Sequence, residues 1–162
     1  MKTFVKHVKV HAFPNLRILL LALFLGIFTS CSVQFVSDYK KEISDEVTSL
    51  MKDIDLFYLR LMEMPVEERE YDACVSYYVD IQADLHSLYY KNKVRPLNEE
   101  STENCLIALE KWKKYKNRHK TDNTLSNANI ELQNQYMQDM LYYILVAEEA
   151  KKDESKDKTD RQ

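Results

Sequence analysis

The sequence is poor in glycine and proline, the two residues that most often shape turns. Among its 162 residues there is one glycine, Gly26, and there are three prolines, Pro14, Pro65 and Pro96. Turns in β-rich folds usually need glycine at positive φ, so this scarcity argues against most of those folds. A glycine-rich phosphate loop and a dinucleotide-binding fingerprint are excluded, because each needs more than one glycine. The composition therefore predicts a helical protein.

Residues that form catalytic and metal sites are also few. After residue 30 the histidines are His86 and His119, which fall at different levels of a helical hairpin and are not expected to share a metal. No haem-attachment motif, HExxH motif or nucleophile elbow is present. Two acidic pairs stand at spacings that do not share a helix face: Asp53/Asp55 and Glu148/Glu149. We expect these pairs on solvated surfaces, and we predict no metal, no cofactor and no enzymatic activity.

Long apolar runs are limited to one stretch near the N-terminus. Residues 1–17 carry four basic and no acidic residues, and an apolar run of eleven residues, 18–28, follows. A basic segment before such a run describes a secretory signal peptide. The run is shorter than the roughly 20 residues that a membrane-spanning helix needs. We therefore predict an exported protein whose signal peptide occupies residues 1–30.

The end of this signal, Phe28-Thr29-Ser30-Cys31, resembles a bacterial lipobox. The resemblance implies cleavage before Cys31 and acylation of that residue, including palmitate. Residues 31–37 would then tether the domain within about 20 Å of the membrane. Ser32 stands where an Asp would retain a lipoprotein in the inner membrane, so the resemblance favours the periplasmic face of the outer membrane. An ordinary signal peptide with an incidental Cys31 is the alternative.

The predicted mature chain is acidic. Removing residues 1–30 takes away four of the 23 basic residues and none of the 26 acidic ones, which leaves a net charge of −7. This charge argues against nucleic acid as a partner and against electrostatic attachment to anionic lipid. The lipid on Cys31 would hold the protein at the membrane.

Four segments of the mature chain carry apolar residues at helical spacing. The first stops before Pro65, the second before Pro96 and the third in a basic run near His119. This pattern predicts an all-α protein, an up-down-up-down four-helix bundle over residues 38–150 with left-handed, coiled-coil-like packing near about +20°. We expect a charged, flexible tail over residues 151–162. In the last helix we assign to the core Leu125, Ala128, Leu132, Tyr136, Met140, Tyr143, Ala147 and Ala150.

Two cysteines remain after Cys31. In a hairpin that turns near Pro96, Cys74 and Cys105 differ in level by about 20 Å, whereas bridged Cα atoms lie within about 7 Å. We therefore expect small buried hydrophobic side chains and no bridge across the hairpin. A disulfide between two molecules is the alternative.

Tyrosines and a basic run provide the candidate interaction surfaces. Adjacent helix residues point about 100° apart, so we assign Tyr78, Tyr89 and Tyr143 inward. Another set is assigned to helix boundaries: Tyr58, Tyr77, Tyr90 and Tyr142. The basic run at residues 111–120 contains Trp112 and Tyr115, which suits an anionic partner, or else it only supports a helix C-terminus. The candidate partner-binding residues are Tyr77, Tyr90, Trp112, Lys113, Tyr115 and Lys116.

The layout resembles that of small bacterial exported lipoproteins with a helical-bundle domain, a group of uncharacterised function. The resemblance rests on Phe28–Cys31, Asp38–Met64 and Tyr77–Leu88. It implies a fold and a place in the cell envelope, and no catalytic residues. We interpret the chain as a membrane-anchored binding, adaptor or envelope-structural protein with a protein partner. The alternatives are a small-ligand carrier within the bundle core and an immunity- or inhibitor-type lipoprotein.

Overall fold

A computed structural model describes residues 36–159, with side chains described from residue 36 to residue 152. This part of the chain contains four α-helices, one short 3-10 helix and no strand. The elements are α2 (Lys41–Glu63), η1 (Val66–Glu68), α3 (Tyr71–Lys93), α4 (Glu99–Asp122) and α5 (Asn127–Thr159). The all-helical prediction is therefore confirmed for these residues. The predicted signal peptide and Cys31 lie outside the described residues.

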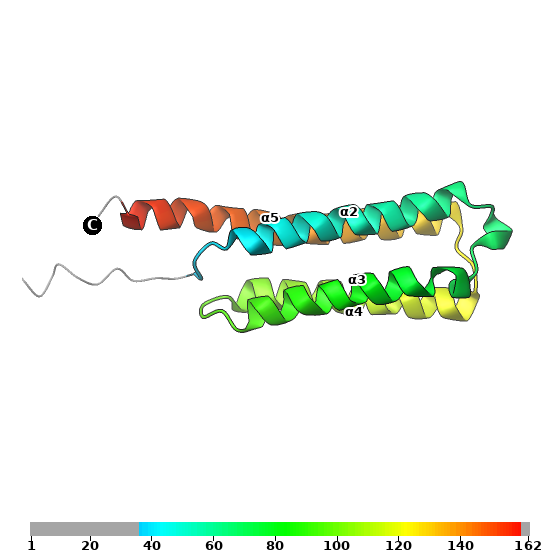
Figure 1. The fold of residues 1–162 in the computed structure, drawn as a ribbon, viewed down its shortest axis with the longest axis horizontal. Coiled ribbons are helices and arrows are strands. Elements are labelled where there is room, and N and C mark those ends of the chain that lie inside the picture. The colour runs from blue at the N-terminus through cyan, green and yellow to red at the C-terminus, as the bar shows by residue number, and fades with distance from the viewer. Residues whose placement is uncertain (1–35, 160–162) are drawn as a thin grey trace, which may run out of the picture. The chain divides into compact units, whose positions relative to one another are not determined.

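The four helices lie side by side, and consecutive helices run in opposite directions (Figure 1). α2 packs mainly against α5, and α3 packs mainly against α4. Lesser contacts between α4 and α5 and between α2 and α3 join these two pairs. Between residues 36 and 159, none of the helices combines the length and apolar character that crossing a bilayer requires.

The helix ends follow local signals in the sequence. α2 stops before Pro65, because the residue preceding a proline is restricted to extended backbone, and Met64 has φ −82° and ψ 142°. α4 ends at Asp122 and is capped by Asn123, whose backbone is left-handed and whose N–H donates to the His119 carbonyl at 2.8 Å. Asparagine tolerates this conformation better than most residues, which suits it to close a helix.

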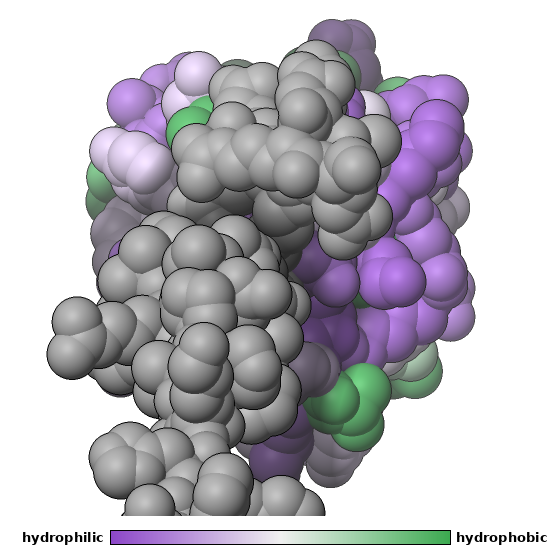
Figure 2. Space-filling view, turned by 90° about the vertical axis from the view of Figure 1, so that its left-hand side faces the viewer, coloured by the Kyte–Doolittle hydropathy of each residue, from purple (hydrophilic) through white to green (hydrophobic). Residues whose placement is uncertain are grey.

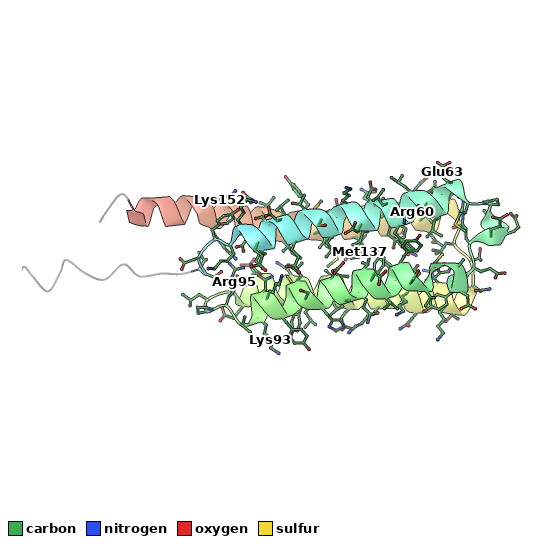
Figure 3. All side chains as sticks on the ribbon, viewed as in Figure 1. Arg60, Glu63, Lys93, Arg95, Met137 and Lys152 are labelled. Atoms are coloured by element: carbon green, nitrogen blue, oxygen red, sulfur yellow. The ribbon has the colours of Figure 1, made fainter. Side chains whose placement is uncertain are left out.

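Aromatic side chains fill the centre of the core. The ring of Phe57 lies 4.8 Å from that of Tyr78 and 5.6 Å from that of Trp112, centroid to centroid, both in edge-to-face contact. Tyr58, assigned to a helix boundary, is instead fully buried, and its hydroxyl donates to Gln133 Oε1 at 3.2 Å. Met137 lies between the two helix pairs (Figure 3).

The two cysteines of the bundle are buried, as predicted. Cys74 and Cys105 are free thiols, and both belong to the hydrophobic core. Burial raises the pKa of both thiols, that of Cys105 to about 12. Each side chain therefore stays a protonated, small apolar group at neutral pH.

α5 turns a different face to the core from the one predicted. Its buried face carries Ile130, Gln133, Met137, Leu141, Ile144, Glu148 and Lys151. Leu132 and Tyr143, both assigned to the core, are 64% and 67% exposed, and Tyr136 is exposed as well. The prediction is wrong because α5 has two stripes of apolar residues, and the stripe that is buried is interrupted by polar side chains.

The end of the bundle also differs from the prediction. α5 continues to Thr159, so helix occupies most of the segment 151–162 that was expected to be a flexible tail. Lys151 is buried and its ammonium group donates to Glu148 one turn earlier at 2.7 Å. Because the Lys151 ammonium group has a buried acceptor within the bundle, the packed part of α5 extends at least to this residue.

Candidate functional site: a buried charged network and two exposed surfaces

Three charged side chains meet inside the bundle at the end where α2 begins. Glu148 is only 1% exposed, and Arg95 and Lys151 are mostly buried around it. Arg95 forms a bidentate contact, from Nη2 to Oε1 at 2.8 Å and from Nη1 to Oε2 at 3.0 Å. Lys151 Nζ donates to Oε2 at 2.7 Å. We call Arg95, Glu148 and Lys151 the charged network, and Figure 3 shows Arg95 between the two helix pairs.

Amide and hydroxyl groups complete the hydrogen bonding of this network. Lys151 Nζ also donates to Asn98 Oδ1 at 2.7 Å and to Ser101 Oγ at 3.3 Å. Asn98 Nδ2 donates to Asn92 Oδ1 at 2.8 Å. Among the described side chains, no buried nitrogen or oxygen lacks a hydrogen-bond partner. The network is therefore fully paired, the condition under which buried charges are tolerated.

The charged network also holds the segment that leads into α2. The backbone N–H of Lys40 donates to Glu148 Oε1 at 2.7 Å. Ser37 is buried, and its hydroxyl donates to Asn98 Oδ1 at 2.8 Å and accepts from Arg95 Nη2 at 3.2 Å. The last residue of the predicted tether is thus fixed to the bundle.

Glu148 corrects the prediction that its acidic pair lies on a solvated surface. Burial raises the pKa of this carboxyl. Hydrogen bonds from Arg95, Lys151 and the Lys40 backbone lower the pKa, and together they outweigh the effect of burial. The net pKa lies below the ordinary value of 4.5, so the carboxylate is ionised at neutral pH. Its role in the described bundle is to fasten three chain segments together.

The opposite end of the bundle buries another arginine. Arg69 Nε donates to the Met64 carbonyl at 2.9 Å, and Nη2 donates to the Met62 carbonyl at 3.2 Å. Nη1 donates to the Leu125 carbonyl at 3.1 Å and to Asn127 Oδ1 at 2.6 Å. Because carbonyls at a helix C-terminus carry partial negative charge, this guanidinium caps α2 electrostatically.

His119 and Trp112 join this end to the core. His119 Nε2–H donates to the Arg69 carbonyl at 2.8 Å, because a carbonyl can only accept, and Nδ1 lies 3.1 Å from the Tyr78 hydroxyl, from which it accepts in the neutral ring. Burial lowers the pKa of His119 below 6.5, against the opposing hydrogen bond to Arg69. Trp112 is fully buried, and its Nε1–H donates to the Tyr78 carbonyl at 3.0 Å. The prediction that Trp112 lies on a binding surface is therefore wrong.

The other candidate binding residues of the basic run already have partners within the bundle. Lys113 Nζ pairs with Glu110 Oε1 at 2.9 Å, and Lys116 Nζ donates to Gln82 Oε1 at 3.2 Å. Tyr115 is half-buried against the core. These contacts favour the simpler interpretation of the run, a basic helix end that pairs with acidic and polar neighbours.

The two predicted tyrosines on α3, here called the α3 surface, are both exposed. The guanidinium of Arg60 lies 5.1 Å from the centroid of the Tyr77 ring, and the ring of His86 stacks on Tyr90 at 6.2 Å. A groove of about 220 Å³ adjoins this surface. It is lined by Asp53, Leu56, Arg60, Tyr77, Asp80, Ile81 and Asp84. Both tyrosines thus have neighbours within the bundle while their outer edges face solvent.

A second exposed surface lies on the outer side of α5. We define the α5 surface as Leu132, Tyr136, Tyr143 and Val146, which are all exposed. Lys111 of α4 places Nζ 4.4 Å from the centroid of the Tyr136 ring, a cation–π contact. This surface was not predicted, because three of its four residues, Leu132, Tyr136 and Tyr143, were assigned to the core. The signal that could have revealed it is an apolar pattern on more than one side of the helix.

A groove of about 430 Å³ opens between α3 and α4 beside the charged network. It is lined by Tyr89, Lys93, Arg95, Asn98, Glu99, Thr102, Glu103 and Leu106. Basic and acidic side chains are balanced there. Within residues 36–152, no cluster of three or more histidine, cysteine, aspartate or glutamate residues is arranged to hold a metal ion.

No protein-family model, curated protein or solved structure matches this chain. What the protein does must therefore be inferred from its own residues. The described bundle presents aromatic and aliphatic side chains on the outer sides of α3 and α5, whereas Arg95, Glu148 and Lys151 are paired with one another inside it.

Proposed function

We propose that this protein is an exported lipoprotein, anchored through Cys31, whose helical bundle is a non-enzymatic binding or adaptor module for a protein partner in the cell envelope. The α5 surface is the observation that carries the proposal. Leu132, Tyr136 and Tyr143 project from a helix whose opposite face already packs in the core. Exposed apolar patches of this kind mark interaction sites more often than they serve a monomer.

The α5 surface is favoured over the α3 surface as the main contact. Tyr143 on α5 is 67% exposed, whereas Tyr77 and Tyr90 are 40% and 57% exposed, so Tyr143 offers a partner more area. Leu132 and Val146 on α5 are exposed as well. Aromatic residues surrounded by apolar neighbours are the usual centres of binding energy at protein interfaces.

The attachment of the chain supports an adaptor role. The lipid anchor is proposed from the sequence around Cys31, and the segment that follows enters the bundle at one end. Ser37 is held there by Arg95 and Asn98. The long sides of α3 and α5 are therefore away from the point of entry and open to a partner.

The alternative of a ligand carrier has less support. The centre of the core is occupied by Phe57, Tyr58, Tyr78 and Trp112 in mutual ring contact. A ligand in that position would have to displace them. An immunity or inhibitor role would use the same kind of surface contact, and it stays a prediction.

The proposal is tested by photo-crosslinking in the native host envelope. A photoreactive phenylalanine analogue at position 143 of the full-length protein should capture one partner, whereas the analogue at position 90 should capture it weakly. With that partner purified, Tyr136→Ser combined with Tyr143→Ser should weaken binding by at least about tenfold. The matched control on α3 is Tyr77→Ser combined with Tyr90→Ser. Unchanged binding by the α5 variant would refute the α5 surface as the contact.

The anchor is tested separately. Mass spectrometry of the peptide that begins at Cys31 should show acyl chains, and Cys31→Ala should release the protein from the membrane fraction. A Cys31 that carries no lipid in the native host would refute the anchor and leave the binding surface to be judged on its own.

A further inference from the structure

The α3–α4 loop, residues 94–98, exposes aliphatic side chains at the end of the bundle where α2 begins (Figure 1). Val94 is 81% exposed, more than any other large hydrophobic side chain among the described residues, and Leu97 is 44% exposed. Figure 2 views the bundle from this end and shows hydrophobic surface beside hydrophilic surface. Because these apolar side chains are exposed, they add little to the stability of the hydrophobic core. Their presence at the loop tip is not explained by packing within the bundle.

The backbone of Leu97 is held in an unfavourable conformation. Its φ is 55°, in the left-handed region that residues with a Cβ atom seldom adopt. The Ser37 N–H donates to the Leu97 carbonyl at 2.9 Å, and the side chain of the next residue, Asn98, is hydrogen-bonded inside the bundle. The fold therefore fixes an exposed leucine at this tip at some cost in stability. Such a cost is often found where a residue serves recognition.

The same hydrogen bond sets the distance from this loop to Cys31. Ser37 is the sixth residue after Cys31, and a fully extended chain of six residues spans about 20 Å. The Ser37 N–H contacts Leu97 directly. The opposite end of the bundle is farther away by the length of α3, whose 23 residues rise about 35 Å. A lipid on Cys31 would thus keep the α3–α4 loop close to the bilayer.

From these observations we infer that the α3–α4 loop docks on the lipid bilayer that holds Cys31, with Val94 and Leu97 entering the interfacial region. This inference rests on the proposed function, because it needs the lipid anchor. Lys93 stands before the loop and Glu99 after it, and Arg95 within it is paired with Glu148, so these charges give little net attraction to anionic lipid. Lys93 Nζ lies on the side of α3, 5.4 Å from the centroid of the Tyr89 ring, so this cation is not directed at the bilayer (Figure 3). The contact is therefore apolar and independent of anionic lipid.

The test compares two valines at opposite ends of the bundle. Val94→Cys and Val66→Cys are made in the full-length, acylated protein, and each is labelled with an environment-sensitive fluorophore. Val66 is the matched control, since it is also exposed and lies in η1. Labelling is selective, because Cys74 and Cys105 are buried and the Cys31 thiol is acylated.

In phosphatidylcholine vesicles, the probe at position 94 should shift to shorter wavelength and be quenched by lipids with a nitroxide near the headgroup. The probe at position 66 should behave as it does in water. Raising the salt concentration, or adding phosphatidylglycerol, should leave both signals unchanged. Two probes that both report water would overturn the docked loop, and quenching at position 94 that requires phosphatidylglycerol would overturn its apolar character.

Two measurements on the same sample separate the possible failures. If mass spectrometry shows acyl chains on Cys31 and the probe at position 94 still reports water, the docked loop is refuted and the anchor stands. If Cys31 carries no acyl chain in protein from its native host, the anchor is refuted and the docking fails with it. A second variant combines Val94→Asp and Leu97→Asp, with the fluorophore attached at position 93 through Lys93→Cys. This variant should stay bound to vesicles through its lipid. Its fluorophore should show the spectrum of a probe in water.

Discussion

Each end of the bundle buries an arginine, but the two arginines are neutralised in different ways. Arg95 makes a bidentate contact with Glu148, a carboxylate that also accepts from Lys151. Arg69 instead donates to backbone carbonyls, including those of Met62 and Met64 at the end of α2. The first arrangement depends on a charge that can be titrated or deleted. The second depends on carbonyl dipoles, which cannot be titrated.

The two ends also fasten different parts of the chain. The charged network joins the segment before α2 to the loop after α3 and to α5, and so it holds the segment that leads toward Cys31. The other end joins the connection between α2 and α3 to the start of α5. Changes at either end should therefore have separate and distinguishable effects.

Replacing Glu148 should have the largest effect on stability. Glu148→Ala leaves Arg95 and Lys151 buried near each other without their shared counter-ion, and removing one partner of a buried ion pair costs about 3–5 kcal/mol. The free energy of unfolding, measured by urea denaturation, should fall by that amount. Glu149→Ala is the matched control, because the neighbouring carboxylate is partly exposed. Similar losses for both variants would contradict a special role for Glu148.

Replacing Arg69 should destabilise the bundle less. Arg69→Met removes hydrogen bonds to carbonyls but leaves no unpaired charge, so we expect a loss of about 1.5–3 kcal/mol. Arg60→Met, in the exposed last turn of α2, is the control and should have little effect. Urea denaturation again provides the measurement. If Arg69→Met is as costly as Glu148→Ala, the distinction between the two ends is wrong.

The two ends should respond to acid at different pH values. Burial lowers the pKa of His119 in the folded protein. As the pH falls, the imidazole is therefore protonated in the unfolded chain before it is protonated in the folded one. The free energy of unfolding should decrease as the pH drops below about 6.5. The pKa of Glu148 is lowered below 4.5, so its contribution is present above that value and is lost only in stronger acid. Urea denaturation from pH 7.5 to about pH 2 should show the His119 step first and the Glu148 step in stronger acid. His119→Gln should remove the first step, and a first step that persists in this variant would rule out His119 as its cause.

Thiol labelling should reveal the smallest differences between the ends. Cys105 accepts a hydrogen bond from Asn92 Nδ2 at 3.5 Å near the charged network, whereas Cys74 lies toward the other end. Both thiols should react with a thiol reagent only when the bundle opens. Glu148→Ala should accelerate the reaction of Cys105 more than that of Cys74, and Arg69→Met should do the reverse. Equal acceleration of both thiols in both variants would mean that the bundle opens as one unit.

The sequence predicted the features that depend on local signals. Helical spacing and the positions of Pro65 and Pro96 located the helices, because proline restricts the backbone wherever it occurs. The burial of Cys74 and Cys105 followed from their places on apolar stripes. None of these inferences required knowledge of which helices are neighbours in space.

The features that the sequence did not predict depend on partners far along the chain. Glu148 is buried because Arg95, 53 residues away, supplies a guanidinium. Trp112 stands among lysines in the sequence, yet its indole N–H bonds to Tyr78, 34 residues away. Without those partners, a charged residue is assigned to the surface and an aromatic one to a binding site. For the same reason, the exposed face of α5 was assigned to the core and its buried face was not.

Amide hydrogen exchange at the two ends tests most directly whether the charged network holds the segment before α2. The Ser37 N–H donates to the Leu97 carbonyl, and the Tyr71 N–H donates to Asn123 Oδ1 at the other end. Glu148→Gln should accelerate exchange at Ser37 and Lys40 much more than at Tyr71. Equal acceleration at all three amides, or unchanged exchange at Ser37, would contradict this account.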